Sequence, residues 1–211
     1  MSYSIDPLTA DCYTGTTCLI NKLNIHDEGQ LAIVEAGITM MKDSELSEHP
    51  IQGKFDFAHY KAIHRYLFED LYVWAGETRT VDMSKKGTSF VKAEDIDRVA
   101  ESAFRRLQGK KLFVGMSFDE FVDNIVDFYD VINMLHPFRE GNGRAQRVFF
   151  TQPIRNAGYD IDFATIDPDE LMVATIQAAG GVEDPLKDVF SEAIRHDKGA
   201  SCVMSDRMGR G

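Results

Sequence analysis

Apolar residues recur along most of this chain at the three- and four-residue spacing of amphipathic helices. The periodic stretches are Leu31–Met41, Phe57–Trp74, Ile96–Leu107, Phe118–Leu135, Leu171–Ala179 and Leu186–Ile194. Start signals agree with several of them. Asp56 can cap the second stretch, and Ser117 with Glu120 makes a capping box before the fourth. Asp167, followed by a proline, opens the fifth. The pattern predicts an all-α protein, a mostly helical bundle.

The segment Glu77–Lys92 breaks this helical pattern. Its alternating polar, β-branched and aromatic positions are Thr78, Thr80, Val81, Thr88, Phe90 and Val91, on either side of Lys85-Lys86-Gly87. Alternation around a glycine-containing turn is typical of a β-hairpin. On these residues alone, a solvent-facing hairpin without a partner is as good an interpretation as a functional one.

A proline lies inside the stretch Arg144–Ala157, which otherwise reads as a helix. Proline removes a backbone hydrogen bond and crowds the residue four positions earlier, at a cost of about 3 kcal/mol or a kink. We therefore expect a kink at Pro153 or an early helix end after Phe150. The effect falls on the packing of Phe149, Phe150 and Ile154 rather than on the start of the helix.

The composition favours one globular domain. The chain has 211 residues, 44% of them hydrophobic and 27% charged, which suits a single core over residues 1–197. Residues 198–211 lack apolar periodicity and are expected to form a flexible tail. No apolar run is long enough to span a membrane, and Met1–Pro7 does not read as a secretory signal. We expect a cytoplasmic protein.

Charge and cysteine content exclude further classes. A formal net charge of −11 argues against direct binding to nucleic acid, which rests on a positive surface. Cys12, Cys18 and Cys202 are odd in number and show no metal-like pairing, so buried or free thiols are the better interpretation.

The stretch from His136 to Arg147 reads His-Pro-Phe-Arg-Glu-Gly-Asn-Gly-Arg-Ala-Gln-Arg. A Gly-Asn-Gly turn before a helix places bare N–H groups and a positive dipole end together, which suits a phosphate. The expected phosphate-binding residues are Gly141, Asn142, Gly143, Arg144 and Arg147. His136 is the natural base because imidazole titrates near neutral pH. Glu140 offers a hard oxygen ligand for Mg²⁺.

Some of these residues also have structural interpretations. Glu140 could simply interact with the N-terminus of the following helix. For Arg144, a structural ion pair is as good an interpretation as direct contact with a ligand. Phe138 reads as a core residue that anchors the loop.

These twelve residues match at every specified position the signature His-x-Phe-x-Asp/Glu-Gly-Asn-Gly-Arg-x-x-Arg, and the chain is identified as a member of the Fic family. The resemblance covers roughly Asp6 to His196. It implies transfer of AMP from ATP to a hydroxyl of a target protein, with His136 taking the proton and Arg147 binding the γ-phosphate. Members with lysine at the place of Gly143 resemble kinases, whereas the glycine form is associated with AMP transfer.

The resemblance also implies partners. In the family, the hairpin is a flap beside the active site that docks an extended piece of the target by strand addition. The docking residues expected from it are Thr80, Val81, Lys86, Gly87, Thr88 and Phe90. Short bacterial members are toxins held inactive in trans by a small antitoxin, and the analogy points to type II topoisomerase subunits as targets with an exposed Tyr, Ser or Thr.

Internal inhibition has only a weak counterpart here. The family's inhibitory helix carries Ser or Thr, three residues, Glu, then Gly or Asn. Asn24–Gly29 comes closest, with Glu28 before a glycine but asparagine in place of the hydroxyl residue. Three other functions stay open: transfer of a γ-phosphoryl or another nucleotide or phosphodiester group, a nucleotide-dependent protein-binding module, and a helical bundle whose glycine loop only turns a corner.

Overall fold

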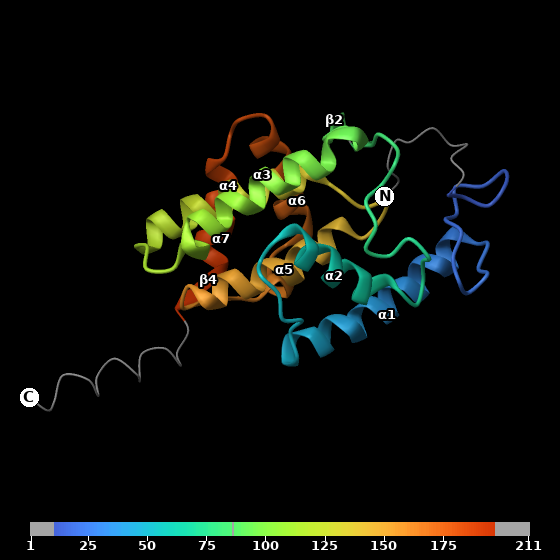
Figure 1. The fold of residues 1–211 in the computed structure, drawn as a ribbon, viewed down its shortest axis with the longest axis horizontal. Helices are drawn as coiled ribbons and strands as arrows, with labels where there is room; N and C mark the ends of the chain where they lie inside the picture. The colour runs from blue at the N-terminus through green and yellow to red at the C-terminus, as the bar shows by residue number, and fades with distance from the viewer. Residues whose placement is uncertain (1–10, 86, 197–211) are drawn as a thin grey trace, which may run out of the picture. The chain divides into compact units, whose positions relative to one another are not determined.

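The computed structural model describes residues 11–85 and 87–196, and this part is mostly helical, as Figure 1 shows. The helices are α1 (Glu28–Glu48), α2 (Phe57–Phe68), α3 (Ile96–Gly109), α4 (Phe118–Leu135), α5 (Asn142–Asn156), α6 (Pro168–Ala179) and α7 (Asp184–Ala193). Two antiparallel strand pairs accompany them, β1 (Ser84–Lys85) with β2 (Thr88–Ser89) and β3 (Tyr159–Ile161) with β4 (Ile194–His196). The prediction of an all-α fold with one hairpin in the segment Glu77–Lys92 is confirmed.

Side-chain caps explain where several helices begin. The carboxylate of Asp27 accepts a hydrogen bond from the N–H of Gln30 at the start of α1. At the start of α2, the carboxylate of Asp56 accepts one from the N–H of His59. Before α4, the carboxylate of Glu120 accepts bonds from both the hydroxyl and the N–H of Ser117. The predicted caps at α2 and α4 are therefore confirmed.

The second helix is shorter than its apolar pattern suggested. α2 ends at Phe68, not at Trp74, and the N–H groups of Leu71 and Tyr72 both turn back to the carbonyl of Phe68. Leu71 and Tyr72 are nevertheless fully buried. Apolar spacing reports burial, and an irregular segment that packs on the core carries the same signal as a helix.

Of the two outcomes expected for the helix that contains Pro153, the early end after Phe150 is wrong, and the kink stays a prediction. α5 continues through Pro153 to Asn156. The residues whose packing the proline was expected to disturb, Phe149, Phe150 and Ile154, are all completely buried. Burial of large side chains commonly contributes more stabilising free energy than the loss of the single hydrogen bond that a proline removes, so the helix continues through Pro153.

The described residues group into two compact units. The first comprises residues 11–85 and 87–105 with Ile132–Phe149, and the second Arg106–Val131 with residues 150–196. In the first unit α1 packs against α2, and a cluster of aromatic rings fills the core, with ring centroids 5.3 Å apart for Tyr60 and Phe138. The motif His136–Arg147 lies wholly in this unit.

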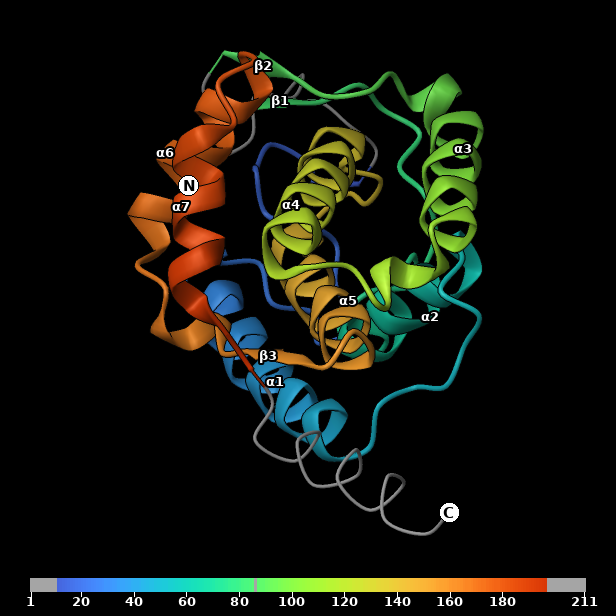
Figure 2. The ribbon, with the colours of Figure 1, turned by 90° about the vertical axis from the view of Figure 1, so that its left-hand side faces the viewer.

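In the second unit α6 packs beside α7, and β4 pairs with β3 (Figure 2). This strand pair was not predicted, and Ile194, expected at the end of a helix, begins β4 instead. Strands of three residues are too short to show a two-residue alternation. None of the helices in the described ranges has the length and apolar character needed to cross a bilayer. Lys86, Cys202 and the expected tail 198–211 lie outside the described residues.

Candidate active site

The loop between α4 and α5 is closed by its own residues. Asn142 brackets it, because its side-chain oxygen accepts from the N–H of Phe138 at 2.8 Å and its amide donates to the carbonyl of Phe138 at 2.7 Å. Gly141 has a φ of +78°, and a Cβ there would lie 2.1 Å from the ring of Phe68. Only glycine fits both the left-handed backbone and the space. The loop therefore presents the N-terminus of α5 in one fixed shape.

His136 follows the last residue of α4 and is 7% exposed. Its ring stacks on that of Phe90 with centroids 3.8 Å apart, and Nδ1 lies 3.3 Å from the carbonyl oxygen of Asn133. A donating Nδ1–H leaves Nε2 as the basic nitrogen. Burial, with help from the charges of Lys85 and Arg79, lowers the pKa of His136 to about 3, so the ring is neutral at physiological pH.

A second histidine, His64, contacts the loop between α4 and α5 through its ring and a hydrogen bond. The ring of His64 stacks on Phe138 at 3.7 Å between centroids; its Nε2 donates to the carbonyl of Glu140 at 2.9 Å, and its Nδ1 accepts from the N–H of Gly76 at 2.9 Å. Burial lowers its pKa to about 3, which keeps this tautomer neutral. Phe138 is completely buried, so its predicted role as a core anchor is confirmed.

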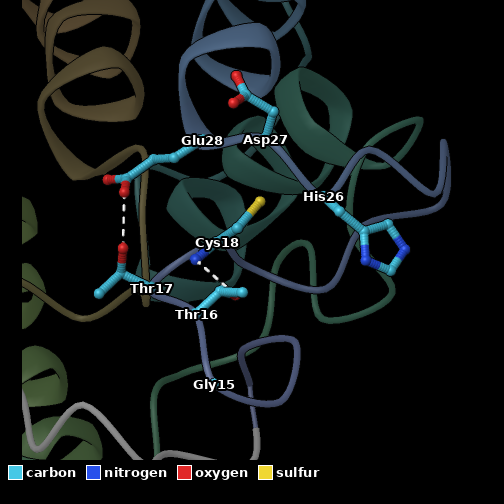
Figure 3. A pocket seen from close by; sticks show the side chains of 7 residues that line it. All are labelled: Gly15, Thr16, Thr17, Cys18, His26, Asp27 and Glu28. Atoms are coloured by element: carbon cyan, nitrogen blue, oxygen red, sulfur yellow. Dashed lines mark hydrogen bonds between the residues drawn. The ribbon is translucent and has the colours of Figure 1, made fainter.

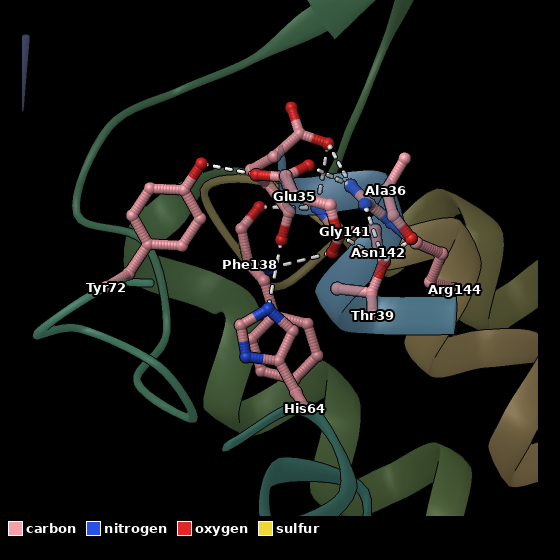
Figure 4. Close-up of polar contacts among 10 residues, drawn as sticks. Glu35, Ala36, Thr39, His64, Tyr72, Phe138, Gly141, Asn142 and Arg144 are labelled. Atoms are coloured by element: carbon pink, nitrogen blue, oxygen red, sulfur yellow. Dashed lines mark hydrogen bonds and ion pairs between the residues drawn. The ribbon is translucent and has the colours of Figure 1, made fainter. Parts of the chain in front are cut away.

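Arg144 lies in a cluster of charged side chains, shown in Figure 4. Its Nη2 donates to Glu35 Oε1 at 2.5 Å and lies 3.5 Å from Glu140 Oε1. The hydroxyl of Tyr72 donates to the other oxygen of Glu35. Burial is the main cause that raises the pKa of Glu140, with the charge of Glu35 acting in the same direction. Of the two interpretations of Arg144, the structure shows the ion pair.

The second arginine of the motif lies one turn further along α5. A Cβ on Gly143 would come within 3.3 Å of Arg147 Nη1, so the guanidinium reaches back toward the glycine turn. Burial raises the pKa of Asp43 on α1, and the positive charge of Arg147 opposes that shift. Gly141, Gly143, Arg144 and Arg147 are thus brought together at the start of α5.

The hairpin lies against the loop between α4 and α5. Ser84 pairs with Ser89 and Lys85 with Thr88, and Gly87 in the turn has a φ of +83°. The N–H of Val91 donates to the carbonyl of Met134 at 3.0 Å. Of the residues expected to dock a target, Thr88 lies in β2 and Phe90 stacks on the ring of His136. Thr80 and Val81 precede the strands.

Arg79 ties the hairpin to the loop and was missed by the sequence analysis. It is almost completely buried, and its Nε donates to the carbonyl of His136 at 2.8 Å. Its two terminal nitrogens donate to the carbonyls of Val81 and Val91, which flank the hairpin. One guanidinium thereby satisfies backbone acceptors from both segments.

The comparisons with known proteins agree with this geometry. The model of the Fic/DOC family matches residues 54–153. A protein of Sinorhizobium fredii named "Probable protein adenylyltransferase y4lH" is 40% identical over 182 residues, which are 86% of this chain and 92% of the relative. This chain belongs to the Fic/DOC family. Protein adenylyltransferase VbhT of Bartonella schoenbuchensis is 38% identical over 181 residues, 86% of this chain but 37% of VbhT. This Fic chain is an enzyme that transfers AMP.

Solved Fic structures share its fold. BepC of Bartonella tribocorum, with bound AMPPNP, has a TM-score of 0.84 at 30% identity over 89% of this chain and 97% of its own. The N-terminal Fic domain of a Bep effector of Bartonella quintana, with bound ADP, has a TM-score of 0.86 at 31% identity over 90% and 96% of the two chains. Both similarities extend well beyond the residues that the family model matches.

The donor set of the Fic site suits Mg²⁺ held jointly by protein and phosphate. In the described ranges, no cluster of three His, Cys, Asp or Glu side chains could form a metal site by itself. Glu140 uses Oε1 to accept from the N–H of Gly141 at 2.8 Å, and its side chain is 27% exposed. Mg²⁺ is usually bound by one or two carboxylates together with substrate phosphates. A single carboxylate beside an anion-binding turn fits that requirement.

A separate hollow of about 470 Å³ lies at the start of α1 and shares no lining residue with the motif (Figure 3). Thr17 donates to the carboxylate of Glu28 at 2.6 Å, and the N–H of Cys18 donates to Thr16. The carboxylate of Glu28, the nearest sequence match to an internal inhibitor, is thus engaged by Thr17. Because these polar groups hydrogen-bond to one another, we assign no chemical role to this hollow.

Sequence reasoning missed Glu35, His64 and Tyr72 as well as Arg79. Glu35 and Thr39 stand at core-facing positions of α1, one and two turns after the buried Leu31. A polar residue on the apolar face of a helix needs a buried partner. That mismatch was a readable signal, although it does not say which partner the residue meets.

Proposed function

We propose that this Fic chain transfers AMP from ATP to a hydroxyl side chain of a target protein. The observation that carries the proposal is a buried, neutral His136 placed directly before a glycine turn that opens α5. The nucleotides bound to the structural relatives BepC and the Bartonella quintana domain support ATP as the donor. We treat residues 1–197 as the one Fic domain responsible.

In the proposed reaction, Nε2 of His136 accepts the proton of the target hydroxyl while the oxygen attacks the α-phosphorus of ATP. The bond from the α-phosphorus to the bridging oxygen breaks, and pyrophosphate leaves with its electron pair. Proton transfer to a positioned side chain commonly contributes about 10²- to 10⁴-fold to such a step. Neutrality of the ring is required, because a protonated imidazole could not accept the proton.

The phosphates are assigned to the start of α5. Backbone N–H groups at Asn142 and Gly143 and the positive helix end suit phosphate oxygens, whereas the N–H of Gly141 donates to Glu140 Oε1. Arg147 is assigned to the γ-phosphate. Glu140 would hold Mg²⁺, which supplies charge neutralisation when bound. Arg144 is assigned to holding the site together through its ion pairs with Glu35 and Glu140. The alternative is that its guanidinium contacts a phosphate directly.

The hairpin is assigned to the target protein. A short exposed strand edge can pair with an extended segment through main-chain bonds, which fixes the register without demanding a particular sequence. The target would present Tyr, Ser or Thr. Bacterial type II topoisomerase subunits are the candidates that the resemblance suggests, and the bacterial cytoplasm is the corresponding location.

The test supplies ATP labelled at the α- or the γ-phosphate to the protein, its His136→Ala variant and its Arg147→Ala variant, with Mg²⁺ and a bacterial lysate. We expect protein bands labelled from α-labelled ATP only, and none with His136→Ala although that variant still binds ATP. Arg147→Ala should weaken productive ATP binding. Normal labelling by His136→Ala would contradict the mechanism, and label from γ-labelled ATP alone would favour γ-phosphoryl transfer.

We also propose that inhibition comes in trans from a small antitoxin-like protein. The engagement of Glu28 by Thr17 supports this indirectly, because it occupies the nearest internal candidate. Expression with the flanking genes of the native operon should co-purify a small protein whose inhibitory glutamate, once replaced, releases labelling activity. A repressed monomer that Glu28→Gly activates would overturn the idea.

A further inference from the structure

Glu35 is a buried carboxylate from a helix that lies outside the residues matched by the family model. It belongs to α1, and its side chain is only 10% exposed. A buried charge is tolerated when it is paired and hydrogen-bonded. Both oxygens of Glu35 are engaged, one by the hydroxyl of Tyr72 and the other by Nη2 of Arg144. Glu35 is thus fixed in place before any ligand arrives.

Arg144 is held from several directions by this arrangement. Thr39 donates its hydroxyl to the carbonyl of Glu35, and the oxygen of that hydroxyl accepts from Arg144 Nη1 at 3.3 Å. The guanidinium carbon lies 4.8 Å from the centroid of the Phe68 ring. A planar guanidinium with this many partners has little freedom to reorient. Besides Glu35 and Thr39, the guanidinium of Arg144 also contacts the carboxylate of Glu140.

Glu140 receives two restraints on the same oxygen. Its Oε1 accepts from the N–H of Gly141 at 2.8 Å and lies 3.5 Å from Arg144 Nη2. The path from Tyr72 through Glu35 and Arg144 therefore ends on Oε1 of Glu140, the proposed Mg²⁺ ligand.

We infer that Glu35 is a positioning residue of the active site, which acts through Arg144 to orient the carboxylate of Glu140. This rests on the proposed function in that Glu140 is taken there as the Mg²⁺ ligand. Two carboxylates share one guanidinium, so the cluster keeps a negative charge for a cation. Without the charge of Glu35, Arg144 would neutralise Glu140 and weaken its hold on Mg²⁺.

The test measures how binding of a non-hydrolysable ATP analogue depends on Mg²⁺ in the wild type, in Glu35→Gln and in Glu45→Gln. Glu45 is a matched control, because it lies on the same helix and accepts a hydrogen bond from the hydroxyl of Tyr66. We expect Glu35→Gln to raise the Mg²⁺ concentration at half-saturation about tenfold or more, as loss of a metal ligand's supporting partner commonly does. Glu45→Gln should match the wild type.

A double variant separates positioning from general damage. If Glu35 acts through Arg144, the effects of Glu35→Gln and Arg144→Gln on half-saturation should not add, so the double variant should be no more impaired than Arg144→Gln alone. If Glu35→Gln fails to fold, Glu35→Asp replaces it. That variant keeps the charge but withdraws it by one methylene, so it should shift half-saturation in the same direction to a smaller extent.

Three results would overturn the inference: a wild-type Mg²⁺ dependence in the folded Glu35 variant, a double variant in which the two single effects add, or wild-type binding that needs no Mg²⁺. The readout is nucleotide binding rather than transfer. Failure of the wild type to label any protein would therefore contradict the proposed function without contradicting this inference. Conversely, a wild-type Mg²⁺ dependence in the Glu35 variant would contradict this inference without contradicting the proposed function.

Discussion

The protonation of His136, the proposed catalytic base, affects the stability of the fold. In the unfolded chain a histidine has a pKa of about 6.5, whereas burial lowers that of His136 to about 3 in the folded protein. Between these values the unfolded state binds a proton that the folded state does not. The free energy of unfolding therefore falls as the pH falls from about 6.5 toward 3. Stability from this residue is fully present only above the unfolded pKa.

Each such histidine should contribute a slope of about 1.4 kcal/mol per pH unit in this window. Urea unfolding of the wild type and of His136→Ala at a series of pH values between 7 and 4 measures the difference. We expect the wild type to lose stability more steeply by about that amount. Equal slopes for the wild type and His136→Ala would show that the imidazole titrates normally.

Residue by residue, the sequence was most informative where the chemistry is local. The motif His136–Arg147 is continuous, so its turn, helix start and base could be predicted together. Glu35 and Arg79 could not be assigned in this way, because their partners lie 109 and 57 positions away along the chain. Only folding brings those pairs into contact, and no short pattern encodes it.

At the scale of elements, Arg79 links the hairpin to the loop between α4 and α5 through hydrogen bonds to both. Replacing Arg79 with alanine would leave the carbonyls of His136, Val81 and Val91 without their buried donor. Hydrogen bonds to a charged group contribute about 1.5–3 kcal/mol each and are not additive. We expect Arg79→Ala to lower the free energy of unfolding by about 3 kcal/mol or more in urea titrations.

The control for Arg79 is Arg98→Ala. Arg98 makes an exposed ion pair with Asp95 three residues earlier, and such pairs contribute about 0–1 kcal/mol. If both variants lost the same small amount, the buried guanidinium would not be the link between hairpin and loop that its contacts indicate.

Element boundaries were predicted less well than element types, and the errors have physical causes. The apolar pattern placed Leu71 and Tyr72 in a helix, although they are buried in an irregular segment. The proline in α5 was given too much weight, because its cost is local while the burial of the neighbouring side chains is larger. The pairing of β3 with β4 joins residues far apart in sequence, which turn signals cannot reveal.

At the scale of the whole chain, similarity extends beyond the catalytic motif. The family model covers residues 54–153, whereas the relative from Sinorhizobium fredii aligns over 86% of the chain. The α1 helix, which carries Glu35, precedes the family-model range. A description of the enzyme confined to that range would omit a carboxylate that contacts the motif. VbhT shows that a comparable Fic region can form 37% of a longer protein.

The close fit of Gly141 against Phe68 affects how mutational scans of this enzyme should be interpreted. Any side chain at residue 141 would collide with an aromatic ring and strain a left-handed backbone, whether or not a nucleotide ever approaches. Intolerance to substitution there would measure an architectural constraint, so it should not be counted as proof of phosphate contact. Selection could preserve the glycine signature in a descendant that has lost catalysis, and the signature alone would then overstate the activity of such a chain.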